Sequence, residues 1–160
     1  MKNISETIRS LMENVTGLRA AIVIDSDGIP IAMEGNIEME PQDLGALLAS
    51  AFQCYQALGD SLNQCYCKMV CAEYDGLNVA QQMMPRGSLI LIAEQSLPMG
   101  VVRLTANTGR QILTEAMETS AEARKKFMER HKISLPKTSG SEDPTQTISL
   151  LSFLEKKKKG

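Results

Sequence analysis

The stretch GLRAAIVIDSDGIPIAMEG, residues 17–35, predicts a β-hairpin that the rest of the chain must cover. Apolar residues occupy every second position on both sides of a polar turn, which is the period of a strand with one buried face. The turn Asp25-Ser26-Asp27-Gly28 places glycine where a hairpin needs a positive φ, and aspartate favours such turns. An isolated hairpin is marginally stable in water, so other elements must pack on it.

Helical periodicity flanks the hairpin on both sides. Residues 2–13 predict an amphipathic helix, and Asn3 with Glu6 three positions later resembles a capping box. A second helix begins at Pro41, a favourable residue for a first helical turn, and should end near Gly59. Its apolar face comprises Leu44, Leu47, Leu48, Ala51, Phe52, Tyr55 and Leu58. This face is wider than one sheet surface requires, which indicates a second packing partner.

Three further strands and a long helix follow. Residues 61–73, 77–84 and 88–94 alternate and are joined by short turns, so we expect an antiparallel meander. From Pro98 a helical pattern runs to about residues 131–132. Its expected apolar stripe is Val101, Leu104, Thr105, Thr108, Ile112, Ala116 and Met117. The predicted order of elements is α-β-β-α-β-β-β-α.

Charge and composition divide the chain. Residues 1–120 hold 7 Lys and Arg against 14 Asp and Glu, whereas residues 121–160 hold 10 against 5. An acidic body argues against a nucleic-acid-binding domain. We predict a domain over 1–131, a flexible linker over 132–147 and an apolar, lysine-rich tail over 148–160 that is disordered or a docking segment. The absence of a signal-peptide pattern and of a long apolar run predicts a cytoplasmic protein without stable membrane insertion.

The phrases ENVTGLRAAIVIDSDGIPIA at 13–32 and PMGVVRLTANTGRQI at 98–112, with the helix from Pro41, resemble the roadblock domain family. This family is named for a dynein light chain and includes bacterial polarity regulators; the resemblance covers residues 2–118. It implies an α/β (α+β) sandwich with a five-stranded antiparallel sheet. The middle helix would lie on one face of the sheet and the first and last helices on the other.

The resemblance also implies a dimer, because roadblock domains typically pair their middle helices and third strands around a two-fold axis. The partner would be a second copy or a paralogous roadblock protein. The interface so implied contains Leu44, Leu47, Leu48, Ala51, Phe52, Tyr55, Cys65, Cys67 and Met69. Arg86, at a hairpin tip, is a candidate contact to a further partner, although an exposed turn residue needs no function.

Two patterns suggest metal ions on first inspection. Cys65, Cys67 and Cys71 share one face of the expected strand, but residues two apart on a strand point in parallel and cannot easily converge on one zinc ion. We favour packing of these thiols, with a thiol contact across a dimer as the next alternative. The turn at 25–28 lacks the later ligands of a calcium loop. We therefore predict no metal and no cofactor.

No pattern predicts catalysis. The chain has one histidine, His131, and no phosphate-binding glycine loop. Family members act as scaffolds or as stimulators of hydrolysis in small Ras-like GTPases, so the resemblance implies a non-enzymatic regulator or scaffold of such a GTPase. The alternative is a bridging subunit of a cytoskeletal motor or filament assembly. A small-molecule sensor is disfavoured because no polar residues converge on the apolar faces of the predicted elements.

Overall fold

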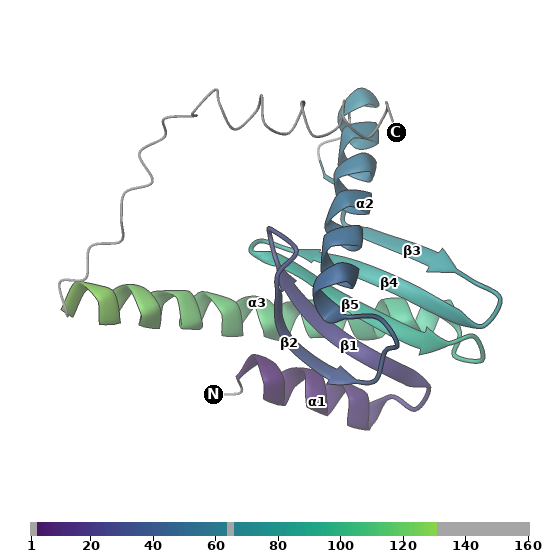
Figure 1. The fold of residues 1–160 in the computed structure, drawn as a ribbon, viewed down its shortest axis with the longest axis horizontal. Coiled ribbons are helices and arrows are strands. Elements are labelled where there is room, and N and C mark those ends of the chain that lie inside the picture. The colour runs from purple at the N-terminus through teal and green to yellow at the C-terminus, as the bar shows by residue number, and fades with distance from the viewer. Residues whose placement is uncertain (1–2, 64–65, 131–160) are drawn as a thin grey trace, which may run out of the picture. The chain divides into compact units, whose positions relative to one another are not determined.

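The computed structural model describes residues 3–63 and 66–130. Its elements are α1 (Ile4–Asn14), β1 (Leu18–Asp25), β2 (Pro30–Gly35), α2 (Pro41–Ser61), β3 (Met69–Glu73), β4 (Leu77–Met84), β5 (Gly87–Glu94) and α3 (Met99–Arg130). The strands form one sheet in the order β2-β1-β5-β4-β3, and every neighbouring pair is antiparallel (Figure 1). The predicted order of elements and the five-stranded antiparallel sheet are confirmed.

Two apolar clusters, one on each face of the sheet, place the helices. The first joins α1 and α3 to the sheet through Ile8, Leu11, Ala21, Val23, Leu89, Leu91, Val102, Ala106 and Leu113, among others. The second joins α2 to the opposite face through Ala20, Ile22, Ile24, Ile90 and Ile92, with Leu44 and Leu48 packed against them. The prediction of two helices on one face and one on the other is therefore correct.

The predicted capping box at the N-terminus of α1 is also observed. The Asn3 side chain accepts a hydrogen bond from the Glu6 amide at 2.7 Å, and the Asn3 amide donates to the Glu6 carboxylate at 3.2 Å, which completes a capping box. An ion pair between Arg9 and Glu34, 3.0 Å long, then links α1 to β2.

The hairpin turn between β1 and β2 is built from its own polar groups. The Asp25 carboxylate accepts hydrogen bonds from the amides of Asp27 and Ile29, both at 2.9 Å. Gly28 takes a φ of +83° and is buried, because its backbone lies directly against Gly45 of α2. The hairpin thus fixes the position of the N-terminal half of α2 in addition to forming the sheet.

Two sequence expectations are wrong in detail. The third strand was expected over 61–73, but α2 continues to Ser61 and β3 begins at Met69. In the observed register Met69 pairs with Gln82, and β4 ends two residues later at Met84 before Pro85, so β4 offers at most two further partners on the N-terminal side of Met69. The buried stripe of α3 is predicted only in part. Thr105 and Met117 are buried as expected, but Val101, Leu104 and Ile112 are exposed, and the stripe is completed by Val102, Ala106 and Leu113.

Contacts group Met1–Ala123 into one compact unit, which contains every element except the last turns of α3. The predicted linker at 132–147 and tail at 148–160, with His131, lie outside the described residues. Within the described ranges, no helix combines the length and the apolar character needed to cross a membrane.

Candidate functional site

The exposed side of α2 is the first candidate surface. Only Gly45 of this 21-residue helix is buried. Leu44, Leu48 and Phe52 are half-buried, and the first two pack on the core of their own chain. Large apolar side chains on the remaining face are open to solvent: Leu47 is 59% exposed, Tyr55 49% and Leu58 55%, and Leu62, directly after the helix, is 61% exposed. In Figure 1 the C-terminal half of α2 extends past the sheet, where no other described element covers it.

The edge strand β3 is the second candidate surface. It pairs with β4 on one side only, so the backbone groups on its outer side are available to a further strand. Met69 is half-buried against the core cluster under α1 and α3, and Cys67 is half-buried just before the strand. Cys65 lies outside the described residues. We call Leu44, Leu47, Leu48, Ala51, Phe52, Tyr55, Cys65, Cys67 and Met69 the α2–β3 surface; its role as an interface stays a prediction.

The cysteines do not form the packed row that the alternation suggested. Cys71 and Cys54 are exposed, and Cys67 precedes β3 rather than belonging to it. Cys67 is instead held by its backbone amide, which donates to the Gln56 side chain at 3.1 Å. Although Cys71 is exposed, partial desolvation by its neighbours raises the pKa of its thiol, Arg103 opposes this effect and Glu73 adds to it. Among the residues that the structure describes, no three His, Cys, Asp or Glu side chains are placed to hold a metal ion.

Arg86 is exposed in the two-residue turn between β4 and β5, where Met84 pairs with Gly87. This position agrees with the predicted hairpin tip. Its contact to a partner stays a prediction.

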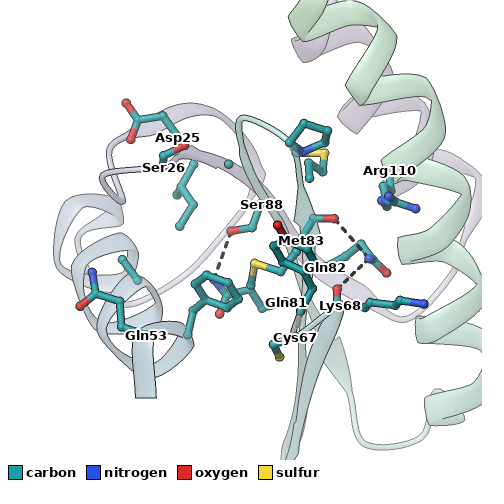
Figure 2. Close-up of a pocket in the computed structure, with 17 residues that line it drawn as sticks. Asp25, Ser26, Gln53, Cys67, Lys68, Gln81, Gln82, Met83, Ser88 and Arg110 are labelled. Atoms are coloured by element: carbon teal, nitrogen blue, oxygen red, sulfur yellow. Dashed lines mark hydrogen bonds between the residues drawn. The ribbon is translucent and has the colours of Figure 1, made fainter. Parts of the chain in front are cut away.

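A cavity of about 670 Å³ lies at the ends of β4 and β5, and we call it the β4-end cavity (Figure 2). Its lining comes from the hairpin turn, α2, residues 66–68, the last four residues of β4, the start of β5 and Arg110 of α3. Ile24, Ala49, Phe52, Met83, Met84 and Pro85 supply the apolar part. The volume falls within the roughly 300–1,000 Å³ typical of small-ligand sites.

The floor of this cavity is polar and deeply buried. Gln81 and Gln82 are each 3% exposed and Ser88 is 2% exposed. Gln81 donates to the Ser88 hydroxyl at 3.1 Å on the α2 side of the sheet. Gln82 lies on the opposite side, toward Arg110 and α3 (Figure 2), and donates to the backbone carbonyls of Lys68 at 2.9 Å and Met83 at 3.3 Å. Its carbonyl oxygen is buried and has no hydrogen-bond partner.

This cluster contradicts the expectation that no polar residues converge on the apolar faces. Gln81 and Ser88 meet on the α2 side of the sheet, whereas Gln82 is buried on the opposite side, because adjacent residues on a strand point to opposite faces. The available signal was a pair of glutamines within LNVAQQMM at 77–84. Because β4 lies between β5 and β3 and helices cover both faces, neither glutamine reaches solvent.

Comparisons with known proteins agree with this architecture. MglB of Myxococcus xanthus is 18% identical, with a TM-score of 0.68 over 72% of this chain and 95% of that one. The gliding protein MglB of Thermus thermophilus is also 18% identical, with a TM-score of 0.65 over 72% of this chain and 89% of its own. A Roadblock/LC7 domain of Streptomyces avermitilis is 13% identical, with a TM-score of 0.67 over 73% of this chain and 99% of that one.

No curated protein matches the sequence. The model of the Roadblock/LC7 domain family matches residues 4–92, from the first residue of α1 into β5. This match spans more than half of the chain, and the structures above share its fold. The chain therefore belongs to the Roadblock/LC7 domain family.

Proposed function

We propose that this protein is a non-enzymatic dimer that binds a small Ras-like GTPase and regulates it or serves as its scaffold. The observation that supports the proposal best is the exposed apolar face of α2, which lies on the same molecule as the open edge of β3. The family resemblance assigns dimerisation to these two elements. Regulation of small GTPases is likewise what the family resemblance implies.

Dimerisation would cover both exposed features at once. Pairing of two β3 strands satisfies the backbone groups along the open edge, and pairing of two α2 helices buries Leu47, Tyr55 and Leu58. A two-fold interface presents the same patch from each subunit, so it needs no second surface. A second copy is the simplest partner, and a paralogous roadblock protein would offer the same elements.

The paired sheets and helices would form a rigid platform for a GTPase. Any increase in GTP hydrolysis would come from holding the switch loops of the GTPase in a competent arrangement. Arg86, exposed at the turn between β4 and β5, is the candidate contact from this chain. The described residues contain no pairing of a nucleophile with a histidine base, since the only histidine lies at position 131.

The dimer is tested by sedimentation of matched single variants. Leu47→Asp and Tyr55→Asp each place a charge on an exposed position of α2, so the monomer should fold while the dimer dissociates. Leu104→Asp is the control, because Leu104 is 67% exposed on α3, outside the α2–β3 surface. An unchanged dimer in both α2 variants would show that this surface is not the interface.

The partner is tested with the small Ras-like GTPases of the same cell. We expect pull-down of at least one of them by the wild-type dimer, and a measurement of GTP turnover with and without the dimer separates a stimulator from a scaffold. Arg86→Ala should weaken the complex while sedimentation still shows a dimer. Crosslinking in cells that finds a motor or filament subunit as the nearest neighbour, with no GTPase captured, would overturn the proposal.

A further inference from the structure

The outer edge of β2 is a second open edge of the sheet, which the proposed dimer does not use. β2 is the last strand on its side of the sheet, and β3 is the last strand on the other (Figure 1). Within the described sheet β2 pairs with β1 alone, so the backbone groups on its outer side are available to a further strand. Pro30 lacks an amide hydrogen only at the first position of the strand, and residues 31–35 keep theirs. This edge can therefore accept another strand.

The side chains along this edge are apolar and exposed. Ile31 is 42% exposed and Met33 38%, and Ile29, directly before the strand, is 59% exposed. Met33 pairs with Ile22, which packs under α2, so Ile31 and Met33 share the α2 side of the sheet. Exposed edge strands usually carry charged residues that prevent uncontrolled pairing, and this side of β2 carries none. The apolar row on β2 therefore favours a partner strand.

The region of the chain around β2 is acidic. The sequence from Ala20 to Cys67 contains no Lys, Arg or His, and its acids are Asp25, Asp27, Glu34, Glu38, Glu40, Asp43 and Asp60. Glu34 forms an ion pair with Arg9 of α1, and Asp25 accepts hydrogen bonds within its own turn. The five others are exposed. This stretch therefore presents negative charge and contains no base of its own to neutralise it.

Three of the exposed acids lie at one end of β2. Glu38 and Glu40 belong to the loop that leaves the strand, and Asp43 lies in the first turn of α2. Arg19 of β1 is near the same end, since its backbone carbonyl accepts the Asn36 amide at 3.2 Å. Three acids against this one base leave a net negative charge next to the apolar row.

This charge selects between possible occupants of the edge. Two copies of the chain that paired through β2 around a two-fold axis would bring both sets of acids to one interface, and like charges across an interface oppose binding. An extended segment with Lys or Arg beside its apolar residues would instead neutralise the acids. Strand addition takes its affinity from main-chain hydrogen bonds and its specificity from alternate side chains.

We propose that the outer edge of β2 binds an extended, basic segment of a partner protein by strand addition. Apolar side chains of the segment lie on Ile31 and Met33, and its Lys or Arg residues lie beside Glu38 and Glu40. The edge belongs to a single chain and lies on the opposite side of the sheet from β3. The proposal therefore depends neither on the dimer nor on the GTPase.

The test is fluorescence anisotropy of two labelled peptides mixed with the full chain. The peptides KKGVTVSVG and GVTVSVGKK carry their lysines before or after the apolar alternation, so they cover antiparallel and parallel addition to β2. We expect a Kd below about 1 mM for one of them. The same peptide with glutamate in place of both lysines should bind at least about tenfold more weakly.

Methylation of the peptide backbone separates strand addition from simple charge attraction. Successive amides of a strand point to opposite edges, so N-methyl groups on one alternate set block one edge only. One methylated form of the tighter peptide should bind about tenfold more weakly than the parent, and the form methylated on the other set should bind about as tightly. Equal affinities of the two forms would overturn the proposal.

Variants of the full chain locate the edge. Met33→Lys should weaken binding at least about tenfold, because it places a charge like that of the peptide in the apolar row. Leu104→Lys is the matched control, since Leu104 is 67% exposed on α3. Glu38→Lys should weaken binding about fivefold relative to Glu115→Lys, an equal charge change at an exposed position of α3. A melting curve checks folding, and Ile31→Lys takes the place of Met33→Lys if that variant unfolds.

Other results would assign the edge differently and overturn the proposal. Neither peptide binding up to about 5 mM would leave the edge without this ligand. Full affinity in Met33→Lys would place the peptide at β3. Tighter binding after Lys156→Ser, Lys157→Ser, Lys158→Ser and Lys159→Ser are combined in the full chain would make the occupant a segment of this protein.

Sedimentation of the same samples reports the second copy separately. Met33→Lys should leave the dimer unchanged, and its dissociation would mean that a second copy occupies the β2 edge. Loss of the dimer in the α2 variants with peptide binding intact would leave this proposal standing, so the failure of either proposal is distinguishable from the failure of the other.

Discussion

The contact between the hairpin turn and α2 gives the sharpest test of how this fold positions its functional surface. Gly28 and Gly45 lie with their backbones against each other, and a Cβ on Gly45 would overlap the Gly28 carbonyl oxygen. The reverse substitution would also clash, because a Cβ on Gly28 would lie 2.8 Å from the Gly45 oxygen, where real Cβ atoms essentially never lie closer than 3.0 Å. We therefore predict that Gly45→Ala destabilises the protein.

The sign of this effect is not obvious, because two terms oppose each other. Alanine in a helix interior is favoured over glycine by about 1 kcal/mol. Against this, the hairpin must withdraw by roughly 1 Å to reach a normal C···O separation of about 3.3–3.6 Å. Overpacking of this kind typically costs about 1–3 kcal/mol, and here backbone rather than a flexible side chain must move. The difference is a net loss of up to about 2 kcal/mol, and we expect the upper part of this range because backbone must move.

Chemical denaturation of the Gly45→Ala and Gly100→Ala variants measures the cost of overpacking at the hairpin directly. Gly100 also lies in a helix, but a Cβ added there meets nothing within 4 Å. Gly100→Ala should therefore be neutral or stabilised by up to about 1 kcal/mol, so the two variants should differ by about 2 kcal/mol, or roughly 6–10 °C in Tm. Equal stability of the two variants would refute the close hairpin–helix contact and the claim that the hairpin positions α2.

Three further outcomes follow from the structure and the sequence. Removal of residues 137–160 should change the Tm of the domain by less than about 2 °C, and a larger drop in a thermal scan would mean that this segment stabilises the domain. Arg9→Ala should cost less than about 1 kcal/mol in urea unfolding, because the Arg9–Glu34 pair is largely exposed; a larger loss would show a packing role for Arg9. At pH 8, Glu73→Gln should speed alkylation of Cys71 and Arg103→Gln should slow it, each by about two- to threefold, because Glu73 raises and Arg103 lowers the pKa of that thiol. Peptide mass spectrometry measures both rates, and unchanged rates would contradict these charge effects.

The fold was predictable where local signals and tertiary packing agree. The hairpin, the capping box at Asn3 and the meander from Leu77 to Glu94 depend on alternation and on turn chemistry, which a short window of sequence contains. The start of β3 was not predictable in this way. It depends on where β4 ends, because β4 stops at Met84 before Pro85 and offers at most two partners on the N-terminal side of Met69.

The face of α3 was predicted correctly at Thr105 and Met117, but a glycine in the buried stripe hid the rest of it. The buried stripe runs Val102, Ala106, Gly109, Leu113 and Met117, and a Cβ on Gly109 would crowd Leu89 and Leu11. Glycine carries no apolar signal, so the periodicity selected the neighbouring stripe through Val101 and Ile112 instead. Close packing of α3 on the sheet therefore depends on Gly109, a residue that a pattern of apolar side chains does not reveal.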